Sequence, residues 1–252
     1  MLDELKQRVE RLMHGRETRP EQTADNWTMI VRERNLLFAS WPIPVPQLRP
    51  LIPSVLDIDT LQDTAWVTVE TLNLTTLFRH LPEGAALEGA EANVRAYVRY
   101  KGERGIHFLS LDSPGAIVDE LSRVLFKLPF RNAEVSVQLN GDNYHIDSIR
   151  TDGHFPPASF ACSARLTGGP AVAPAVSLEA WLLDQTCLFA VASNGDVYRG
   201  YVAHRPHTIQ PVEGIIETNT LVSAAGLTLP DVKPLFSYSP GDDSMAWPIS
   251  KV

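Results

Sequence analysis

The fold of this chain is decided by Glu91–Gly105, EANVRAYVRYKGERG, and by Ile106–Arg131, IHFLSLDSPGAIVDELSRVLFKLPFR. Polar and apolar side chains alternate over residues 91–112, which predicts two β-strands joined at KGERG. Apolar residues then recur at helical spacing and predict a helix over residues 115–127, which Pro129 ends. The stretch therefore predicts a hairpin, a short helix and a turn bounded by proline.

The first predicted strand has one polar and one apolar face, because successive side chains point to opposite sides. The apolar face should pack on a core. The polar face has two interpretations: a solvent-exposed strand surface, or the polar wall of an internal cavity that holds a small ligand. Its side chains are Glu91, Asn93, Arg95, Tyr97 and Arg99.

The flanking sequence predicts many strands and few helices. Residues 2–13 predict an amphipathic helix, and the polar residues 15–25 predict a linker, so the expected division is 1–25 and 26–252. The remaining elements are expected as strands near 27–43, 65–74, 130–168, 187–217 and 235–248, short helices near 44–52, 176–185 and 219–225, and a loop over 79–90. The βαβ rhythm of a parallel sheet is missing, so the fold class is α+β, built on antiparallel sheet.

Composition indicates a soluble, cytoplasmic protein. The 252 residues carry a net charge of −8 without a run of Lys or Arg, which argues against nucleic acid and an anionic membrane surface as partners. No apolar run approaches the roughly 20 residues of a membrane span, and the N-terminus lacks a signal sequence. Cys162 and Cys187 lie in apolar segments and are expected as buried free thiols.

Cofactor and metal motifs are not expected to contribute. The chain has no G-x-S-x-G, G-x-G-x-x-G or P-loop motif. His204 and His207 are three residues apart in HRPH, but Pro206 favours a loop, and a set of metal ligands would need Glu213 or Asp242-Asp243 to fold nearby. We therefore predict no cofactor and no metal, and we interpret Asp242-Asp243 as an exposed acidic turn.

Seven segments together resemble the YqjF-like family, an uncharacterised branch of the acetoacetate decarboxylase-like superfamily. They extend over nearly all of the main domain. The resemblance implies packed antiparallel sheets that form a cone-like barrel with a few short helices and enclose a cavity. The segments are LLFASWPIP (36–44), EANVRAYV (91–98), FLSLDS (108–113), LFKLPF (125–130), VYRGYVAHRPHTIQP (197–211), ETNTLVSAAGLTLP (217–230) and FSYSPGDDSMAWP (236–248).

The resemblance also places site residues. It puts Glu91 where the decarboxylases keep an active-site glutamate, and Arg34, with Arg32 as the alternative, near their substrate-facing arginine. The decarboxylases carry two adjacent lysines after the proline, where this chain has Phe130 and Arg131. An arginine cannot form an imine at neutral pH, so the alignment excludes Schiff-base decarboxylation at this position.

We therefore expect a decarboxylase-like scaffold that binds or converts a small carbonyl compound or organic acid without an imine. Glu91 is the candidate acid or base, and the candidate binding residues are Arg34, Asn93, Arg95, Tyr97, His107 and Phe130. Whether the protein is an enzyme stays open. The alternatives are a non-catalytic small-molecule sensor, or an assembly protein whose helix 2–13 mediates homo-oligomer formation.

Overall fold

The computed structural model describes residues 26–115 and 127–252, so the predicted helix 2–13 and all but the two end residues of the predicted helix 115–127 lie outside the described residues. Strands dominate, as predicted. In chain order the elements are β1 (Met29–Ile43), α2 (Val45–Leu48), η1 (Arg49–Leu51), β2 (Asp57–Ile58), β3 (Ala65–Phe78), η2 (Glu83–Ala85), β4 (Leu87–Tyr100), β5 (Glu103–Ser113), β6 (Phe130–Asn140), β7 (Asn143–Arg150), β8 (Ser159–Leu166), β9 (Ala171–Val172), α4 (Leu178–Leu183), β10 (Cys187–Val191), β11 (Val197–Ala203), β12 (Thr208–Ile209), β13 (Val212–Asn219), α5 (Leu221–Ala224), β14 (Leu235–Ser239), β15 (Asp243–Ala246) and β16 (Ser250–Lys251).

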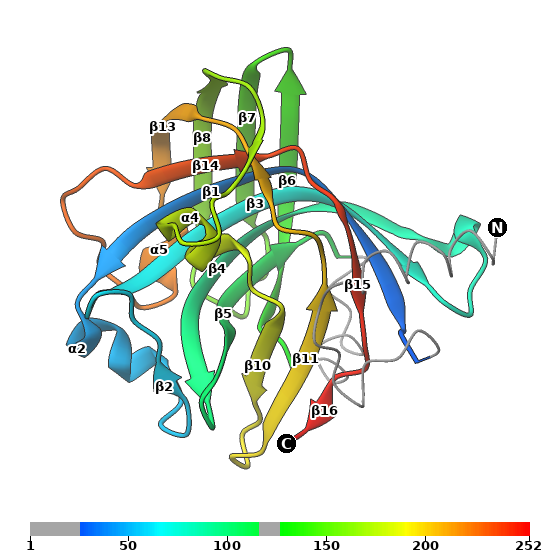
Figure 1. Cartoon of the computed structure of the whole chain (residues 1–252), viewed down its shortest axis with the longest axis vertical. Coiled ribbons are helices and arrows are strands. Elements are labelled where there is room, and N and C mark those ends of the chain that lie inside the picture. The colour runs from blue at the N-terminus through cyan, green and yellow to red at the C-terminus, as the bar shows by residue number, and fades with distance from the viewer. Residues whose placement is uncertain (1–25, 116–126) are drawn as a thin grey trace.

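The strands form one long sheet that closes on itself. Strand β5 pairs with β4 and also with β10, so the pairing runs β1–β3–β4–β5–β10–β11–β15 and back to β1. From β5 the sheet also continues outward through β6, β7, β8 and β13, which rise from the ring in Figure 1. Most pairs are antiparallel, whereas β5–β6 and β5–β10 are short parallel contacts.

The ring strands bury side chains on both faces. One apolar cluster contains Val67, Val69, Val94 and Ala96 from β3 and β4. A second cluster uses alternate positions of the same strands and adds α4 and the first residue of β6; it contains Leu36, Phe38, Leu72, Leu74, Tyr97, Ile106, Leu111, Phe130, Leu182 and Leu183. The polar side chains of β4 lie on the face of this second cluster, so the solvent-exposed interpretation of that face is wrong for Asn93 and Arg95, which are buried.

The local predictions mostly agree with the structure. Ser177 caps α4, and its hydroxyl accepts a hydrogen bond from the Ala180 amide at 3.1 Å. The loop expected over 79–90 is shorter than predicted, because β4 begins at Leu87. Within the described ranges the longest helix, α4, has six residues, so none has the length and apolarity to cross a bilayer.

A β-bulge in β1 sets which side chains face the second cluster. The register against β3 shifts between Arg34 and Leu37, and Asn35 there has a φ of 54°. The loop before β15 holds the bulge in place, since the Glu33 amide donates to the Asp242 carbonyl at 2.9 Å. A bulge inserts one residue, so the face that a given side chain occupies reverses across it.

Gly241 permits the close approach of that loop to the bulge. Its φ is +97°, and a Cβ there would overlap the Glu33 carbonyl oxygen. We expect Gly241→Ala to lower the free energy of unfolding by about 2–4 kcal/mol, because the strain of a positive φ adds to the cost of moving the Glu33 backbone away. Urea unfolding measures this loss. Gly153→Ala is the matched control, since a Cβ at Gly153 meets nothing within 4 Å; similar small losses in both variants would contradict the prediction.

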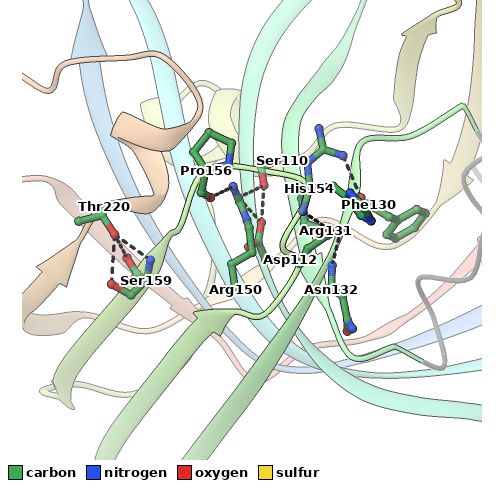
Figure 2. A network of polar contacts seen from close by, with 11 residues as sticks. Ser110, Asp112, Phe130, Arg131, Asn132, Arg150, His154, Pro156, Ser159 and Thr220 are labelled. Carbon is green, nitrogen blue, oxygen red and sulfur yellow. Dashed lines mark hydrogen bonds and ion pairs between the residues drawn. The ribbon is translucent and has the colours of Figure 1, made fainter.

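A buried ion pair joins the ring to the outer strands β6, β7, β8 and β13. Arg150, at the end of β7, donates to both carboxylate oxygens of Asp112 in β5, each at 2.8 Å, and to the Ser110 hydroxyl at 2.9 Å. It also donates to the Pro156 carbonyl at 3.0 Å, and Figure 2 shows the three acceptor groups around one guanidinium. The Arg150 and Asp112 side chains are 3% and 0% exposed, so the pair is fully desolvated.

Candidate functional site

A polar pair interrupts an otherwise apolar row across the sheet. The pairing register aligns Phe38 in β1 with Glu70 in β3, Glu70 with Asn93 in β4, Asn93 with Leu111 in β5, and Leu111 with Phe130 in β6. Directly paired residues share one face of a sheet, so these five side chains lie side by side. The buried glutamate and asparagine at the centre therefore need polar partners.

The polar residues on this face form what we term the interior cluster: Glu33, Glu70, Glu91, Asn93 and Arg95. Its central contact is the ion pair from Arg95 Nη1 to Glu70 Oε1, at 3.0 Å. Arg95 Nη2 also donates to the Leu182 carbonyl of α4 at 3.1 Å. Burial is the largest effect and opposes the charge on Arg95, but Glu70, Tyr97 and Glu33 together outweigh it and raise the pKa of the guanidinium.

Glu91 is held by neutral hydrogen-bond donors. Its two carboxylate oxygens accept from Asn93 Nδ2 at 3.0 Å and from the Ser113 hydroxyl at 2.9 Å. Burial raises the pKa of Glu91, although these two hydrogen bonds act in the opposite direction. A carboxyl group with a raised pKa and no ion pair among the described residues is suited to hold or release a proton.

Glu33 reaches the same cluster from β1. Its carboxylate accepts from the Ser244 hydroxyl of β15 at 2.9 Å. Burial raises the pKa of Glu33 to about 7, and the negative charges of Glu70 and Glu91 contribute. Glu33 and Glu91 thus lie near the Glu70 carboxylate, and its negative charge favours retention of their protons.

This raised pKa predicts a pH-dependent effect of Glu33→Gln. In the native protein Glu33 keeps its proton up to about pH 7, whereas its ordinary value is 4.5, so stability falls as pH rises through that window. The amide cannot ionise, so the variant should gain about 1–2 kcal/mol over the wild type at pH 8 and nothing at pH 4. Urea unfolding at both pH values measures the gain. Exposed Glu134→Gln is the control, and a gain independent of pH would contradict the prediction.

Tyr97 and α4 cover the cluster. The Tyr97 hydroxyl shares a hydrogen bond of 2.7 Å with Thr68, and its ring lies 4.9 Å from that of Trp181. Burial raises the pKa of Tyr97. Phe130 is buried beside Leu111 in the second apolar cluster, whereas Arg131 lies over the Phe155 ring at 3.5 Å. The position that the resemblance aligns with the decarboxylases' lysine thus holds a buried aromatic ring beside the cluster.

Two predicted site residues lie elsewhere. Arg34 is half-exposed and pairs with Asp243 at 2.8 Å, because the bulge turns Glu33 rather than Arg34 toward the cluster. Asp243 is 1% exposed, so the prediction of a solvated acidic turn is wrong for this residue. His107 pairs with Ala96 and so lies on the opposite face from Arg95.

His107 instead lines a pocket of about 500 Å³ that contains none of the cluster residues. The pocket wall includes Lys127, Phe189 and Ser193. His107 Nδ1 is 2.9 Å from the Phe189 carbonyl, and burial lowers the pKa of its imidazole. This pocket and the interior cluster are therefore separate places in the fold.

A second histidine, His207, lies beside the cluster with a set of groups of the metal-binding kind. Ligand atoms of Asp184, His204 and His207 lie within 4.8 Å of one another. However, His204 Nδ1 and Nε2 face the carbonyl oxygens of Arg205 and Gln185 at 2.8 and 3.0 Å. A ring nitrogen that donates to a carbonyl has no lone pair for a metal, so His204 would have to turn first. The acidic member is Asp184, not the Glu213 or Asp242-Asp243 considered from sequence.

Sequence reasoning missed two members of the cluster, Glu33 and Glu70. Glu70 alternates with apolar neighbours on a strand predicted from sequence, so its face was visible, but its partner across the sheet was not. Glu33 joins the cluster only because of the bulge in β1. The one local sign of that bulge in the sequence is Asn35, a residue type that tolerates positive φ better than most.

The family model DUF2071, described as an uncharacterized conserved protein, matches residues 31–243. An uncharacterized protein from Bacillus subtilis, YqjF, is 36% identical over 230 residues, which cover 89% of this chain and 93% of that protein. Acetoacetate decarboxylase from Legionella pneumophila superposes with a TM-score of 0.60 at 13% identity, over 96% of this chain and 95% of that one. The enduracididine biosynthesis enzyme MppR, solved with pyruvate, gives 0.61 at 10% identity over 94% and 93%. These likenesses show an acetoacetate decarboxylase-like fold.

Proposed function

Because the chain belongs to the DUF2071 family of uncharacterised conserved proteins, we propose a function for the interior cluster from its own geometry: it binds a small polar molecule. The observation that carries this proposal is an unmet need for hydrogen bonds at the cluster. Asn93 is 2% and Arg95 5% exposed, yet Asn93 Oδ1 and Arg95 Nε have no hydrogen-bond partner within the described part of the chain. A buried polar atom without a partner costs about 1–3 kcal/mol, which a polar ligand would recover.

The proposed chemistry does not include an imine. Phe130 occupies the aligned lysine position, and Lys101, Lys233 and Lys251 are exposed. Lys127 lines the separate pocket. We therefore expect no lysine adduct when the protein is treated with pyruvate and borohydride and analysed by mass spectrometry. A reduced adduct on any lysine would contradict this part of the proposal.

Glu91 is the proposed acid or base. An ionised Glu91 would accept a proton from a carbon next to the ligand carbonyl, and the protonated form would return it. The fold has room for such compounds in at least one neighbour, since MppR was solved with pyruvate. Tyr97 and Phe130 would form the apolar wall that excludes water from the bound molecule.

The test of this function is a binding screen run beside a turnover assay. Small ketones and ketoacids are added to the full chain, thermal shifts are recorded, and products are followed by NMR. We expect Glu91→Gln to lower the turnover rate by a factor of at least about 100 and to leave the circular dichroism spectrum unchanged. Exposed Glu134→Gln should change neither quantity. Unchanged turnover in Glu91→Gln would remove the assigned role.

A non-catalytic sensor is the second candidate. The observation that favours it is Phe130, an unreactive ring beside the polar cluster at the position that the resemblance aligns with the decarboxylases' lysine. The same screen separates the two functions. A ligand that stabilises the protein, depends on Glu91 and yields no product supports a sensor.

A further inference from the structure

The interior cluster holds more negative than positive groups. Its carboxylates are Glu33, Glu70 and Glu91, and Arg95 is its one cation among residues 26–115 and 127–252. Arg95 is committed to Glu70 and to the Leu182 carbonyl. Glu33 and Glu91 accept hydrogen bonds from neutral donors instead, and no ion pair in the described structure includes either of them.

The two cluster atoms without hydrogen-bond partners indicate which ligand groups would fit beside these charges. Asn93 Oδ1 is an acceptor, and it belongs to the amide that donates to Glu91. Arg95 Nε is a donor two residues along the same strand face. Successive positions on one face of a strand are about 7 Å apart, which is the span of a ligand with four to six heavy atoms.

We infer, on the basis of the proposed function, that the interior cluster takes a small organic cation that also carries an oxygen acceptor, such as an amino ketone. Its ammonium group lies between Glu33 and Glu91 and donates to Asn93 Oδ1. Its oxygen accepts from Arg95 Nε.

An organic acid fits this cluster less well. A carboxylate would meet Glu33 and Glu91 without a free cation to offset the repulsion. Arg34, which the sequence suggested as the anion partner, is engaged with Asp243 outside the cluster. His207 supplies no charge, because burial and the neighbouring His204 lower the pKa of its imidazole to about 3.

Cation binding should depend on pH. The titratable or charged groups that face the site are Glu33 from β1, Glu70 from β3, Glu91, Arg95 and Tyr97 from β4, and His207 from the segment after β11. Burial raises the pKa of Glu33 to about 7, so Glu33 is largely neutral at pH 6 and ionised at pH 8. A bound ammonium group favours the ionised form, so affinity rises over this range. An anion would bind better at the lower pH.

Three compounds of similar size separate charge from shape: 4-aminobutan-2-one and 4-hydroxybutan-2-one, which match in heavy atoms, and acetoacetate, which has one more. Titration calorimetry of the full wild-type chain at pH 6 and pH 8 gives the dissociation constants. We expect the amine to bind at least about 10-fold more tightly than the alcohol at pH 8, and acetoacetate to bind most weakly. The preference for the amine should fall in Glu33→Gln and Glu91→Gln and persist in Glu134→Gln.

The outcomes distinguish the preference for a cation from the proposed binding function. Equal binding of amine and alcohol, or tighter binding of acetoacetate, overturns the inference that the ligand is a cation. The proposed binding function then still stands if Glu91→Gln weakens the binding. Binding of none of the three, or binding that ignores both Glu91→Gln and Asn93→Leu, overturns the proposed function as well. Because the charge series uses the wild-type chain, a variant that fails to fold does not decide the result.

Discussion

Arg150→Met should destabilise the protein by about 3–5 kcal/mol, the largest stability loss that we expect from any side chain of the outer strands. The substitution leaves the fully buried Asp112 carboxylate without its cation and also removes hydrogen bonds to Ser110 and Pro156. For a chain of this size, the loss corresponds to a fall in Tm on the order of 10 °C. Urea unfolding and calorimetry measure both quantities.

A second substitution separates the loss of the ion pair from the cost of leaving the Asp112 carboxylate buried without a partner. Asp112→Leu in the Arg150→Met background removes the unpaired carboxylate, so most of the stability should return, as it does when apolar residues replace a buried pair of similar volume. Arg165→Met on the exposed face of β8 is the matched control and should change stability by less than about 0.5 kcal/mol. If Arg150→Met and Arg165→Met had the same small effect, the pair would not hold the outer strands to the ring.

Arg95→Met should affect both stability and ligand binding. Glu70 would stay buried beside an apolar side chain, at a cost of about 3 kcal/mol in the free energy of unfolding. Ligand binding should weaken at least about 10-fold, because Arg95 Nε is one of the two atoms of the interior cluster that lack a hydrogen-bond partner among the described residues.

The double variant Arg95→Met with Glu70→Gln distinguishes these effects. Removing the Glu70 charge should restore most of the stability without restoring binding, since the donor at position 95 is still missing. Arg95→Lys keeps the charge and should retain more stability than Arg95→Met. Recovery of binding in the double variant would show that Arg95 stabilises the fold and has no part in ligand binding.

The sequence predicted the strands of this fold well, because their signals are local. Alternation in Ala65–Phe78 and in Leu87–Tyr100 follows from burial of one face or both, and Asn194-Gly195-Asp196 is itself the turn between β10 and β11. The resemblance supplied the register that places Phe130 at the aligned lysine position. These features depend on residues near each other in the chain.

The composition of the cluster was harder to predict, because it depends on long-range register. Glu33 enters the cluster and Arg34 leaves it only because one extra residue is accommodated near Asn35. Without that bulge the alternation along β1 would place Arg34 on the face of Leu36 and Phe38. A residue 208 positions away, Asp242, accepts from Arg34 Nη1 and helps fix the choice, and no local pattern reports such a contact.

Closure of the ring limits the number of strand edges through which copies of this protein could aggregate. Apart from short β2, the long path ends at β13, whose outward hydrogen-bonding groups could template addition of a foreign strand. Glu213 and Glu217 place charges along this strand, and a bulge between Ile216 and Thr218 bends it. Charge and curvature at an open edge oppose the flat stacking that begins amyloid growth.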